Sequence, residues 1–175
     1  MQRIQLPKGV FELDPDKPLG KRGGFGQVFC GQSPTNGNLA IKRLYVSAVD
    51  AAHRELRIAE ELSGRSFQNV IPFIDSGEDP DSGSYFIVMP RAEKSLQDLI
   101  DLEPPRSPAE AAVIMLQILS GLLEVPELIH RDLKPANVLF HENKWKVADF
   151  GIAKFVEESI RLEGQRLTLD VHSFA

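Results

Sequence analysis

The stretch IHRDLKPANVLFHENKWKVADFGIA, residues 129–153, contains two aspartates, Asp132 and Asp149, each within a dense polar signature. Two short apolar runs, residues 138–140 and 145–148, lie between them and are joined by a polar, turn-prone linker. This pattern predicts two short strands in a hairpin, with a polar loop before the first strand and after the second. Because such a hairpin would hold the two loops side by side, we expect Asp132 and Asp149 to converge on one site.

Upstream of this stretch, residues 10–90 have the pattern of a small, mostly antiparallel sheet with one helix. Residues 1–18 contain three prolines and are expected to form an extended lead-in. Strands are expected at residues 28–30, 39–45, 70–74 and 85–89, with a hairpin turn at Asn36-Gly37. The helix is expected over residues 48–63, and its apolar stripe consists of Ala52, Leu56, Ala59 and Leu62.

Between the sheet pattern and residue 129, the sequence becomes helical. Residues 90–94 form a polar bridge and mark the expected lobe boundary, and a short helix is expected over residues 95–101. Ser107, followed by Pro108 and Glu110, is a typical helix start. The helix that follows, to about residue 124, is apolar nearly all round, which predicts burial on several sides.

Composition and charge exclude several classes of protein. The chain has 175 residues and a net charge of −5, which gives no support to binding of nucleic acid or of an anionic membrane surface. No apolar run approaches a membrane span, and the N-terminus lacks the apolar region of a signal peptide. The single cysteine, Cys30, excludes an internal disulfide, and a reducing, cytoplasmic compartment is expected.

Several motifs follow one another in a fixed order. A glycine-rich turn, GGFGQV at residues 23–28, precedes the strand residue Lys42 and the helix residue Glu55, and then come HRDLKPAN at residues 130–137 and DFG at residues 149–151. In this order they resemble the catalytic domain of the eukaryotic-type (Hanks-type) serine/threonine protein kinases. The HRDLKPAN and DFG matches are long and specific, and the resemblance covers residues 10–154.

The resemblance implies an α+β fold of the protein-kinase type. Residues 1–90 would form an antiparallel-sheet N-lobe with one helix, and residues 91–175 an incomplete, mostly helical C-lobe. It also implies ATP- and Mg²⁺-dependent transfer of a phosphoryl group to serine or threonine hydroxyls of a protein substrate. Lys134, within HRDLKPAN, resembles the serine/threonine-directed branch of the family rather than the tyrosine-directed one.

The nucleotide-binding residues implied by the resemblance come mostly from the first half of the chain. Backbone donors of the glycine-rich turn would cover the phosphates, and an aromatic residue would cap its tip: Gly23, Gly24, Phe25 and Gly26. Three side chains would enclose the adenine, and one backbone position would offer it hydrogen bonds: Val28, Ala40, Met89 and Ala92. Lys42 would hold the α- and β-phosphates and pair with Glu55, which the family spacing favours over the neighbouring Glu60 and Glu61.

The catalytic and metal-binding residues implied by the resemblance lie in the stretch quoted first. Asp132 would accept the proton of the substrate hydroxyl, and Lys134 would neutralise the γ-phosphate. Asn137 and Asp149 would bind Mg²⁺, because hard oxygen ligands suit that ion. His130 is expected to pack and to form hydrogen bonds rather than to act in catalysis.

The sequence departs from the family pattern at two places. The first glycine of the usual pattern would fall on Lys21, so either the turn carries an insertion at Gly20 or Lys21 substitutes for that glycine. After DFG the chain ends at Ala175 without an APE-type motif, which predicts one kinase domain truncated within its activation segment. Such a truncation would expose apolar C-lobe surface, through which the chain could bind a partner or itself.

Three interpretations therefore stay open. The chain is an active serine/threonine kinase, a nucleotide-binding fragment of impaired activity that acts as an interaction module, or a remnant that is unstable alone.

Overall fold

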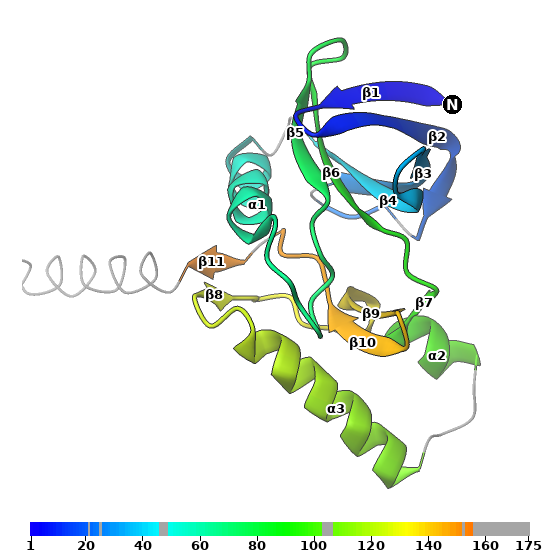
Figure 1. The fold of residues 1–175 in the computed structure, drawn as a ribbon. Coiled ribbons are helices and arrows are strands. Elements are labelled where there is room, and N and C mark those ends of the chain that lie inside the picture. Colours follow the sequence, from blue (N-terminus) through cyan, green and yellow to red (C-terminus); the bar gives the residue numbers. More distant parts are fainter. Residues whose placement is uncertain (21, 25, 46–48, 103–106, 152, 156–175) are drawn as a thin grey trace, which may run out of the picture.

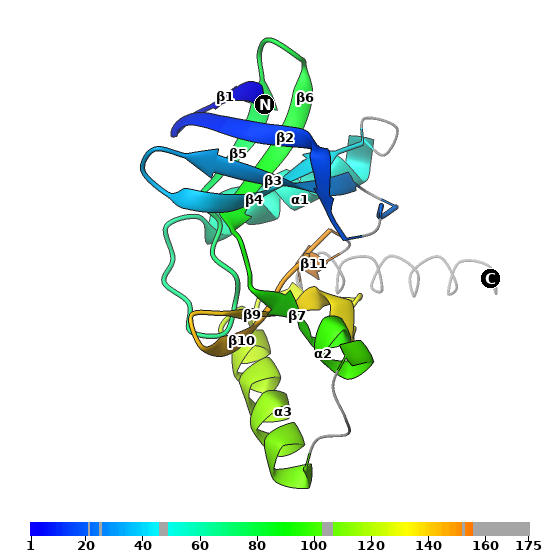
Figure 2. The ribbon, with the colours of Figure 1, turned by 90° about the vertical axis from the view of Figure 1, so that its right-hand side faces the viewer.

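The computed structural model describes residues 1–20, 22–24, 26–45, 49–102, 107–151 and 153–155. A six-stranded sheet with helix α1 on one side forms one region, and helices α2 and α3 with short strands form a second region below it (Figure 1). The turned view shows strand β6 leading from the sheet down to the second region (Figure 2). Within the described residues, no helix has both the length and the apolar character needed to cross a membrane.

The six strands of the sheet pair antiparallel throughout, in the order β1-β2-β3-β4-β6-β5. Their bounds are Gln2–Leu6 (β1), Gly9–Leu19 (β2), Gly26–Ser33 (β3), Gly37–Leu44 (β4), Asp75–Asp79 (β5) and Ser84–Pro90 (β6). The expected antiparallel sheet over residues 10–90 is thereby confirmed, and the predicted turn at Asn36-Gly37 joins β3 to β4.

The N-terminal residues differ from the predicted extended lead-in, because they form the hairpin of β1 and β2. Their apolar residues alternate and are buried in one cluster with residues of β4 and β6: Ile4, Leu6, Phe11 and Leu13. Two of the prolines lie where the pairing of strands tolerates a residue without a backbone N–H. Pro7 lies in the turn, and Pro18 follows a register shift in the pairing of β2 with β3.

The β1–β2 hairpin also contacts β5, at the other end of the strand order, through carboxylates. The buried Asp79 accepts hydrogen bonds from the backbone N–H of Gln5, at 2.9 Å, and from the hydroxyl of Ser82, at 2.6 Å. The buried Asp75 accepts one from the backbone N–H of Lys8, at 2.8 Å. These side chains supply acceptors to a strand edge that has no backbone partner on that side, and so bring the sheet close to a closed barrel.

The predicted strand at residues 70–74 is wrong. Val70 forms only an isolated parallel bridge with Val147, and the Ile71 N–H donates to the Val147 carbonyl at 2.9 Å. The true strand β5 begins at Asp75, within a stretch that is polar and turn-rich in sequence. Val70, the first residue of this apolar run, is instead fully buried in the core of the second region.

Helix α1, Val49–Leu62, connects the sheet to the second region. All four residues of its predicted apolar stripe are buried. Ala52, Leu56 and Ala59 pack with sheet residues, whereas Leu62 joins the core of the second region. Because the helix contributes to both cores, its position is constrained from both sides.

The second region consists of two helices and five short strands. Their bounds are Lys94–Ser95 (β7), Leu96–Leu102 (α2), Pro108–Leu123 (α3), Leu128–Ile129 (β8), Val138–His141 (β9), Lys144–Val147 (β10) and Lys154–Phe155 (β11). The helix start expected at Ser107 is confirmed, and the structure shows that Ser107 and Glu110 form a capping box there. The two-residue strands β7, β8 and β11 were not predicted, because so short a segment has no period to detect.

The hairpin predicted between the two aspartates is present as β9 and β10. Glu142 and Asn143 connect the strands and both have positive φ, 51° and 59°, as a two-residue turn of this twist requires. The rings of Phe140 and Trp145 pack across the strands with centroids 5.0 Å apart. The polar loops on either side of the hairpin are therefore held by a packed unit.

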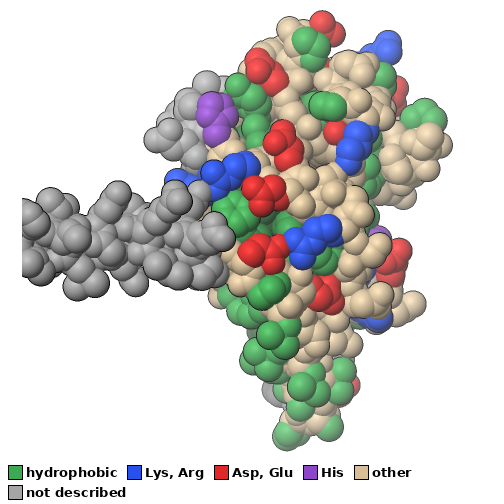
Figure 3. All heavy atoms as spheres, turned by 60° about the vertical axis from the view of Figure 1, so that its left-hand side comes forward, with side chains coloured by type: hydrophobic (Ala, Val, Ile, Leu, Met, Phe, Trp, Pro, Cys, Tyr) green, Lys and Arg blue, Asp and Glu red, His purple; other side chains and the backbone are tan. Residues whose placement is uncertain are grey.

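Helix α3 is not buried on several sides, which corrects the prediction from its sequence. Ile118 and Gly121 are buried against the second core. Five other apolar side chains of α3 are each more than half exposed among the described residues: Val113, Met115, Leu116, Leu119 and Leu123. Apolar side chains are visible along this lower part of the molecule (Figure 3).

Asp79 gives a prediction about stability and pH. Burial alone would raise the pKa of Asp79, but hydrogen bonds from Gln5 and Ser82 outweigh it and hold that pKa below its ordinary value. A lowered folded-state pKa stabilises the fold above the unfolded value, about 3.9, and this contribution is lost as pH falls through the folded value. We expect Asp79→Asn to lower the free energy of unfolding by about 1–3 kcal/mol at neutral pH.

Urea unfolding at neutral pH and at a pH below the ordinary Asp range measures this difference. It should shrink at the acidic pH, because the carboxyl is protonated first in the unfolded wild-type chain, and it should vanish once the folded carboxyl is protonated too. The control is Asp81→Asn, an exposed aspartate in the same turn, which should leave stability unchanged. A difference that stays constant with pH would contradict the role assigned to the Asp79 charge.

Candidate active site

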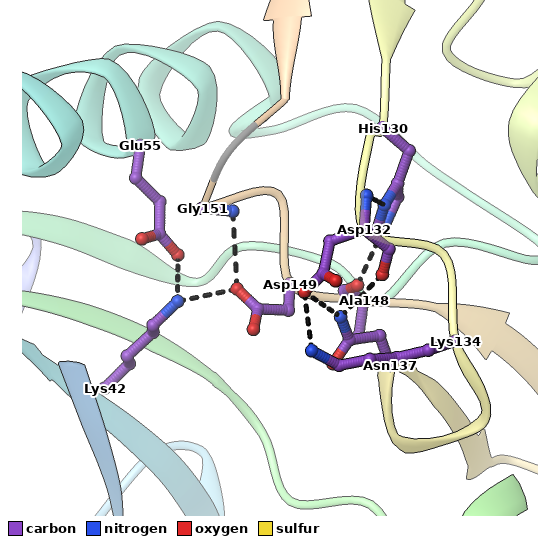
Figure 4. Close-up of polar contacts among 9 residues, drawn as sticks. All are labelled: Lys42, Glu55, His130, Asp132, Lys134, Asn137, Ala148, Asp149 and Gly151. Carbon is purple, nitrogen blue, oxygen red and sulfur yellow. Dashed lines mark hydrogen bonds and ion pairs between the residues drawn. The ribbon is translucent and has the colours of Figure 1, made fainter. Parts of the chain in front are cut away.

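Lys42 lies between two carboxylates that come from distant parts of the chain (Figure 4). Its Nζ is 2.5 Å from Glu55 Oε1 and 2.6 Å from Asp149 Oδ1. Strand β4 supplies Lys42, helix α1 supplies Glu55, and the loop after β10 supplies Asp149. Glu60 and Glu61, on the same helix, are both exposed. The side chain of Lys42 thus links the sheet, helix α1 and the loop that contains Asp149.

Burial and charge act against each other in this cluster. Burial lowers the pKa of Lys42, but the carboxylates of Glu55 and Asp149 outweigh it and raise that pKa above its ordinary value. Burial raises the pKa of Glu55 above its ordinary value, although Lys42 opposes this. For Asp149 burial also raises the pKa, yet Lys42 reverses the direction and holds it below normal. At neutral pH, Lys42 and Asp149 are therefore both charged.

The backbone after Asp149 packs tightly against the cluster. The N–H of Gly151 donates to Asp149 Oδ1 at 3.3 Å. A Cβ at residue 151 would lie 3.1 Å from Glu55 Oε2 and 3.2 Å from Asp149 Oδ1, tighter than ordinary contacts. Glu55 Oε2 itself is buried without a hydrogen-bond partner among the described residues. Sequence reasoning did not single out Gly151, although the DFG motif contains the signal for it.

The loop before β9 gathers Asp132, Lys134 and Asn137 (Figure 4). Lys134 Nζ is 2.7 Å from Asp132 Oδ2. Asn137 Nδ2 donates both to the Asp132 carbonyl, at 2.9 Å, and to Asp132 Oδ2, at 3.1 Å. Asp132 is thereby oriented by an amide from the short 3₁₀ turn Pro135–Asn137, while its side chain stays 37% exposed and open to a substrate.

His130 joins this loop to the loop of Asp149. The backbone N–H of Asp132 donates to His130 Nδ1 at 3.3 Å, so the other ring nitrogen, Nε2, carries the proton and donates to the Ala148 carbonyl at 3.0 Å. The ring of His130 is buried and packs on Phe150, with centroids 4.9 Å apart. His130 holds the two polar loops against each other and does not face the open side of the site.

Both loops contain a non-glycine residue with left-handed backbone. Arg131 has φ of 67° and Asp149 has φ of 61°. Such conformations are uncommon outside glycine and persist only where surrounding contacts hold them. At Asp149 those contacts include the ion pair with Lys42 and the hydrogen bond from Gly151.

The sheet brings the residues implied for adenine contact onto the face that carries Lys42. Val28 lies directly opposite Lys42, and Met89 lies directly opposite Ala40. Because Ala40 and Lys42 are two residues apart on one strand, all four side chains share one face. Ala92 lies farther along, between β6 and β7.

The glycine-rich turn is described in part. The turn lies between Leu19, the last residue of β2, and Gly26, the first residue of β3, and the Gly23 N–H donates to the Gly26 carbonyl at 3.1 Å. A Cβ at Gly26 would lie 2.5 Å from the Arg43 carbonyl, so only glycine fits there, whereas Gly24 faces open space. The predictions for Phe25 and for Lys21 fall outside the described residues.

The donor set of Asn137 and Asp149 fits a magnesium ion that is also held by substrate phosphates. Asn137 uses its amide nitrogen for Asp132, and Asp149 uses Oδ1 for Lys42, which leaves the oxygens Asn137 Oδ1 and Asp149 Oδ2 for an ion. In the part of the chain that is described, no group of three His, Cys, Asp or Glu residues could hold a metal alone. This suits Mg²⁺, which is commonly bound through one or two protein ligands, phosphates and water.

Comparison with known proteins identifies the family. Residues 14–170 match the family model described as protein kinase domain. The chain is 31% identical over 150 residues to the serine/threonine-protein kinase pakG of Dictyostelium discoideum, covering 83% of this chain and 12% of that protein. It is 35% identical over 147 residues to a probable serine/threonine-protein kinase of Corynebacterium efficiens, covering 78% and 22%.

A third relative, the serine/threonine-protein kinase PrkC of Bacillus subtilis, is 34% identical over 139 residues, covering 75% of this chain and 21% of PrkC. The chain thus spans less than a quarter of the length of each of these three relatives. The match to the family model nevertheless covers strands β3 to β6, part of β2, helix α1 and both polar loops of the site. The fold, the site and this match together show that the chain belongs to the protein kinase family.

Proposed function

We propose that the chain binds Mg²⁺–ATP and transfers the γ-phosphoryl group to serine or threonine hydroxyls of a protein substrate. The observation that carries this proposal is the contact of Lys42 with both Glu55 and Asp149, beside the cluster of Asp132 and Asn137. Phosphoryl transfer depends mainly on positioning and on compensation of charge. A buried lysine fixed by two carboxylates, next to a carboxylate open to substrate, meets both needs.

Each residue has a distinct task in this proposal. Lys42 binds the α- and β-phosphates, and Glu55 keeps Lys42 in place. Asp132 accepts the proton of the substrate hydroxyl as its oxygen bonds to the γ-phosphorus and the bond from that phosphorus to the β-phosphate oxygen breaks. Lys134 balances charge on the γ-phosphate. Asn137 and Asp149 would hold magnesium, which would supply positive charge to the phosphate oxygens.

The nucleotide base and the phosphates take up the face of the sheet beside Lys42. Val28, Ala40 and Met89 enclose the adenine, and the backbone at Ala92 offers it hydrogen bonds. The N–H groups of Gly23, Gly24 and Gly26 cover the phosphates, with Phe25 at the tip of the turn. In this assignment, residues 1–90 are the N-lobe and residues 91–175 contribute to the C-lobe.

The substrate class and the location belong to the same proposal. Lys134 within HRDLKPAN favours serine and threonine acceptors, and the three relatives described above carry that specificity in their names. The single cysteine of the chain suits a reducing compartment, so we propose the cytoplasm. The partners are then ATP and a protein substrate, without nucleic acid.

The exposed face of α3 favours a second candidate function, as an interaction module. Its five exposed apolar residues are neighbours at helical spacings of three and four, with Leu116, Leu119 and Leu123 farthest from the buried Gly121. A contiguous apolar patch of this kind usually marks an interaction site. We propose that the chain self-associates or binds a partner through this face, whether or not it transfers phosphate.

Replacement of Asp132 tests the first function. Incubation of the chain with radiolabelled Mg²⁺–ATP and casein should label serine and threonine of the casein. Asp132→Asn should lower the rate by about 10²–10⁴-fold, because the proton acceptor is lost. Asp81→Asn, an exposed control, should transfer at the wild-type rate. Equal rates for Asp132→Asn and wild type would contradict the assignment, and no transfer by wild type would leave only the interaction module.

Replacement of two α3 leucines tests the second function. Leu116 and Leu119 are 64% and 52% exposed, so changing both to Gln should leave thermal stability nearly unchanged while removing apolar surface. Sedimentation over a concentration series should show weaker self-association than wild type. Ile100→Gln, at an apolar residue of α2 that is 56% exposed, is the control. A wild-type chain that remains monomeric throughout would refute self-association.

A further inference from the structure

A groove of about 580 Å³ lies on the face of the sheet opposite the candidate active site. Residues of β2, β3, β4, β6 and their connections line it: Pro18, Arg22, Gln27, Phe29, Arg43, Leu44, Tyr45 and Ser84. Arg43 follows Lys42 directly on β4, and neighbouring strand residues point to opposite faces. Gln27 lies directly opposite Arg43 in the register, so both side chains share this outer face.

The groove begins where the apolar packing of this face ends. The cluster formed with the β1–β2 hairpin covers the outer face over Ile41 and Phe86, and Phe29 packs at its margin. The pairing of β2 with β3 is interrupted between Leu13 and Pro18. Beyond this point the outer face changes from apolar residues to arginine, glutamine and serine, while the aromatic rings of Phe29 and Tyr45 remain as walls.

The arginines of the groove have no carboxylate partner among the described residues. The guanidinium of Arg22 stacks over the ring of Tyr45, with Cζ 4.6 Å from its centroid. Arg43 Nη2 donates to Ser84 Oγ at 3.4 Å, and both arginines are exposed. No lining residue is acidic, in a chain with 25 acidic and 20 basic residues. Arg65, by contrast, forms a salt bridge with Glu127.

A second groove, of about 520 Å³, provides a comparison within the same sheet. Arg3 and Glu12 both line it, so its positive charge is offset by a carboxylate. Only the first of these two grooves combines two arginines with neutral and aromatic neighbours. The lining of the first groove therefore carries a net positive charge, whereas that of the second does not.

We propose that the first groove binds a phosphorylated serine or threonine within a peptide segment of a partner protein. A phosphate monoester carries a charge of about −1.5 to −2, which two guanidinium groups balance. Guanidinium groups form paired hydrogen bonds with phosphate oxygens. The amide of Gln27 uses one N–H for the Val28 carbonyl and has a second to donate. Phe29, Tyr45 and Pro18 offer apolar contact for the residues that flank the phosphate. Arginine clusters are a recurring means of recognising phosphorylated motifs.

Fluorescence anisotropy with a labelled, degenerate peptide library that contains one fixed phosphothreonine tests the proposal. A saturating non-hydrolysable ATP analogue with Mg²⁺ is present throughout to occupy the site of Lys42. The phosphorylated library should bind at least about tenfold more tightly than matched libraries with threonine or glutamate at that position. Arg22→Gln with Arg43→Gln should remove this preference. Arg3→Gln, at an exposed arginine of the second groove, should retain it.

The outcomes separate this proposal from its alternatives. Thermal unfolding of each variant is compared first, and the exposed positions predict unchanged midpoints. Equal affinity for the glutamate library would show a general acidic site and overturn the proposal. Binding that is seen only in a parallel titration without the ATP analogue would assign the phosphate to the site of Lys42 and overturn the proposal as well. Because the readout is binding alone, it does not depend on phosphoryl transfer.

Discussion

The Nζ of Lys42 lies 2.5 Å from Glu55 Oε1 and 2.6 Å from Asp149 Oδ1, so one cation joins strand β4, helix α1 and the loop after β10. Taking these charges out of water costs several kcal/mol per ion, and only close pairing compensates for it. The position of α1 makes such pairing geometrically possible, because its apolar stripe packs on the sheet and on the second core. The candidate site is thus a consequence of how the two cores share one helix.

The second half of the site depends on contacts that hold two polar loops together. The β9–β10 hairpin separates the loops in sequence, and His130 connects them by its bond to the Ala148 carbonyl. The left-handed backbone conformation of Arg131 and of Asp149 helps to orient the polar side chains of the two loops. Asp132 is then oriented by Asn137 from one side while it stays open on the other. Proton acceptance and ion binding, as proposed, would use these two loops separately.

Local patterns in the sequence correctly predicted the elements that depend on interactions between residues close together in the chain. The stripe on α1, the turn at Asn36-Gly37, the start of α3 and the β9–β10 hairpin all have such patterns. Strand β5 is polar in sequence and becomes a strand only because β6 pairs with it, whereas residues 70–74 are apolar but serve the second core. The groove of Arg22 and Arg43 could not be predicted from the sequence. Finding it requires the strand register and the position where the apolar packing of the outer face ends, and neither is visible in the sequence.

The most direct test of the account is a double-mutant cycle on Lys42 and Glu55, measured as Mg²⁺–ATP affinity by titration calorimetry. If Glu55 acts by holding Lys42, Glu55→Gln should weaken binding in the wild-type background and have no further effect once Lys42→Met is present. Glu60→Gln, at an exposed residue of the same helix, should have no effect in either background. Additive losses from Lys42→Met and Glu55→Gln would contradict the central place given to their contact.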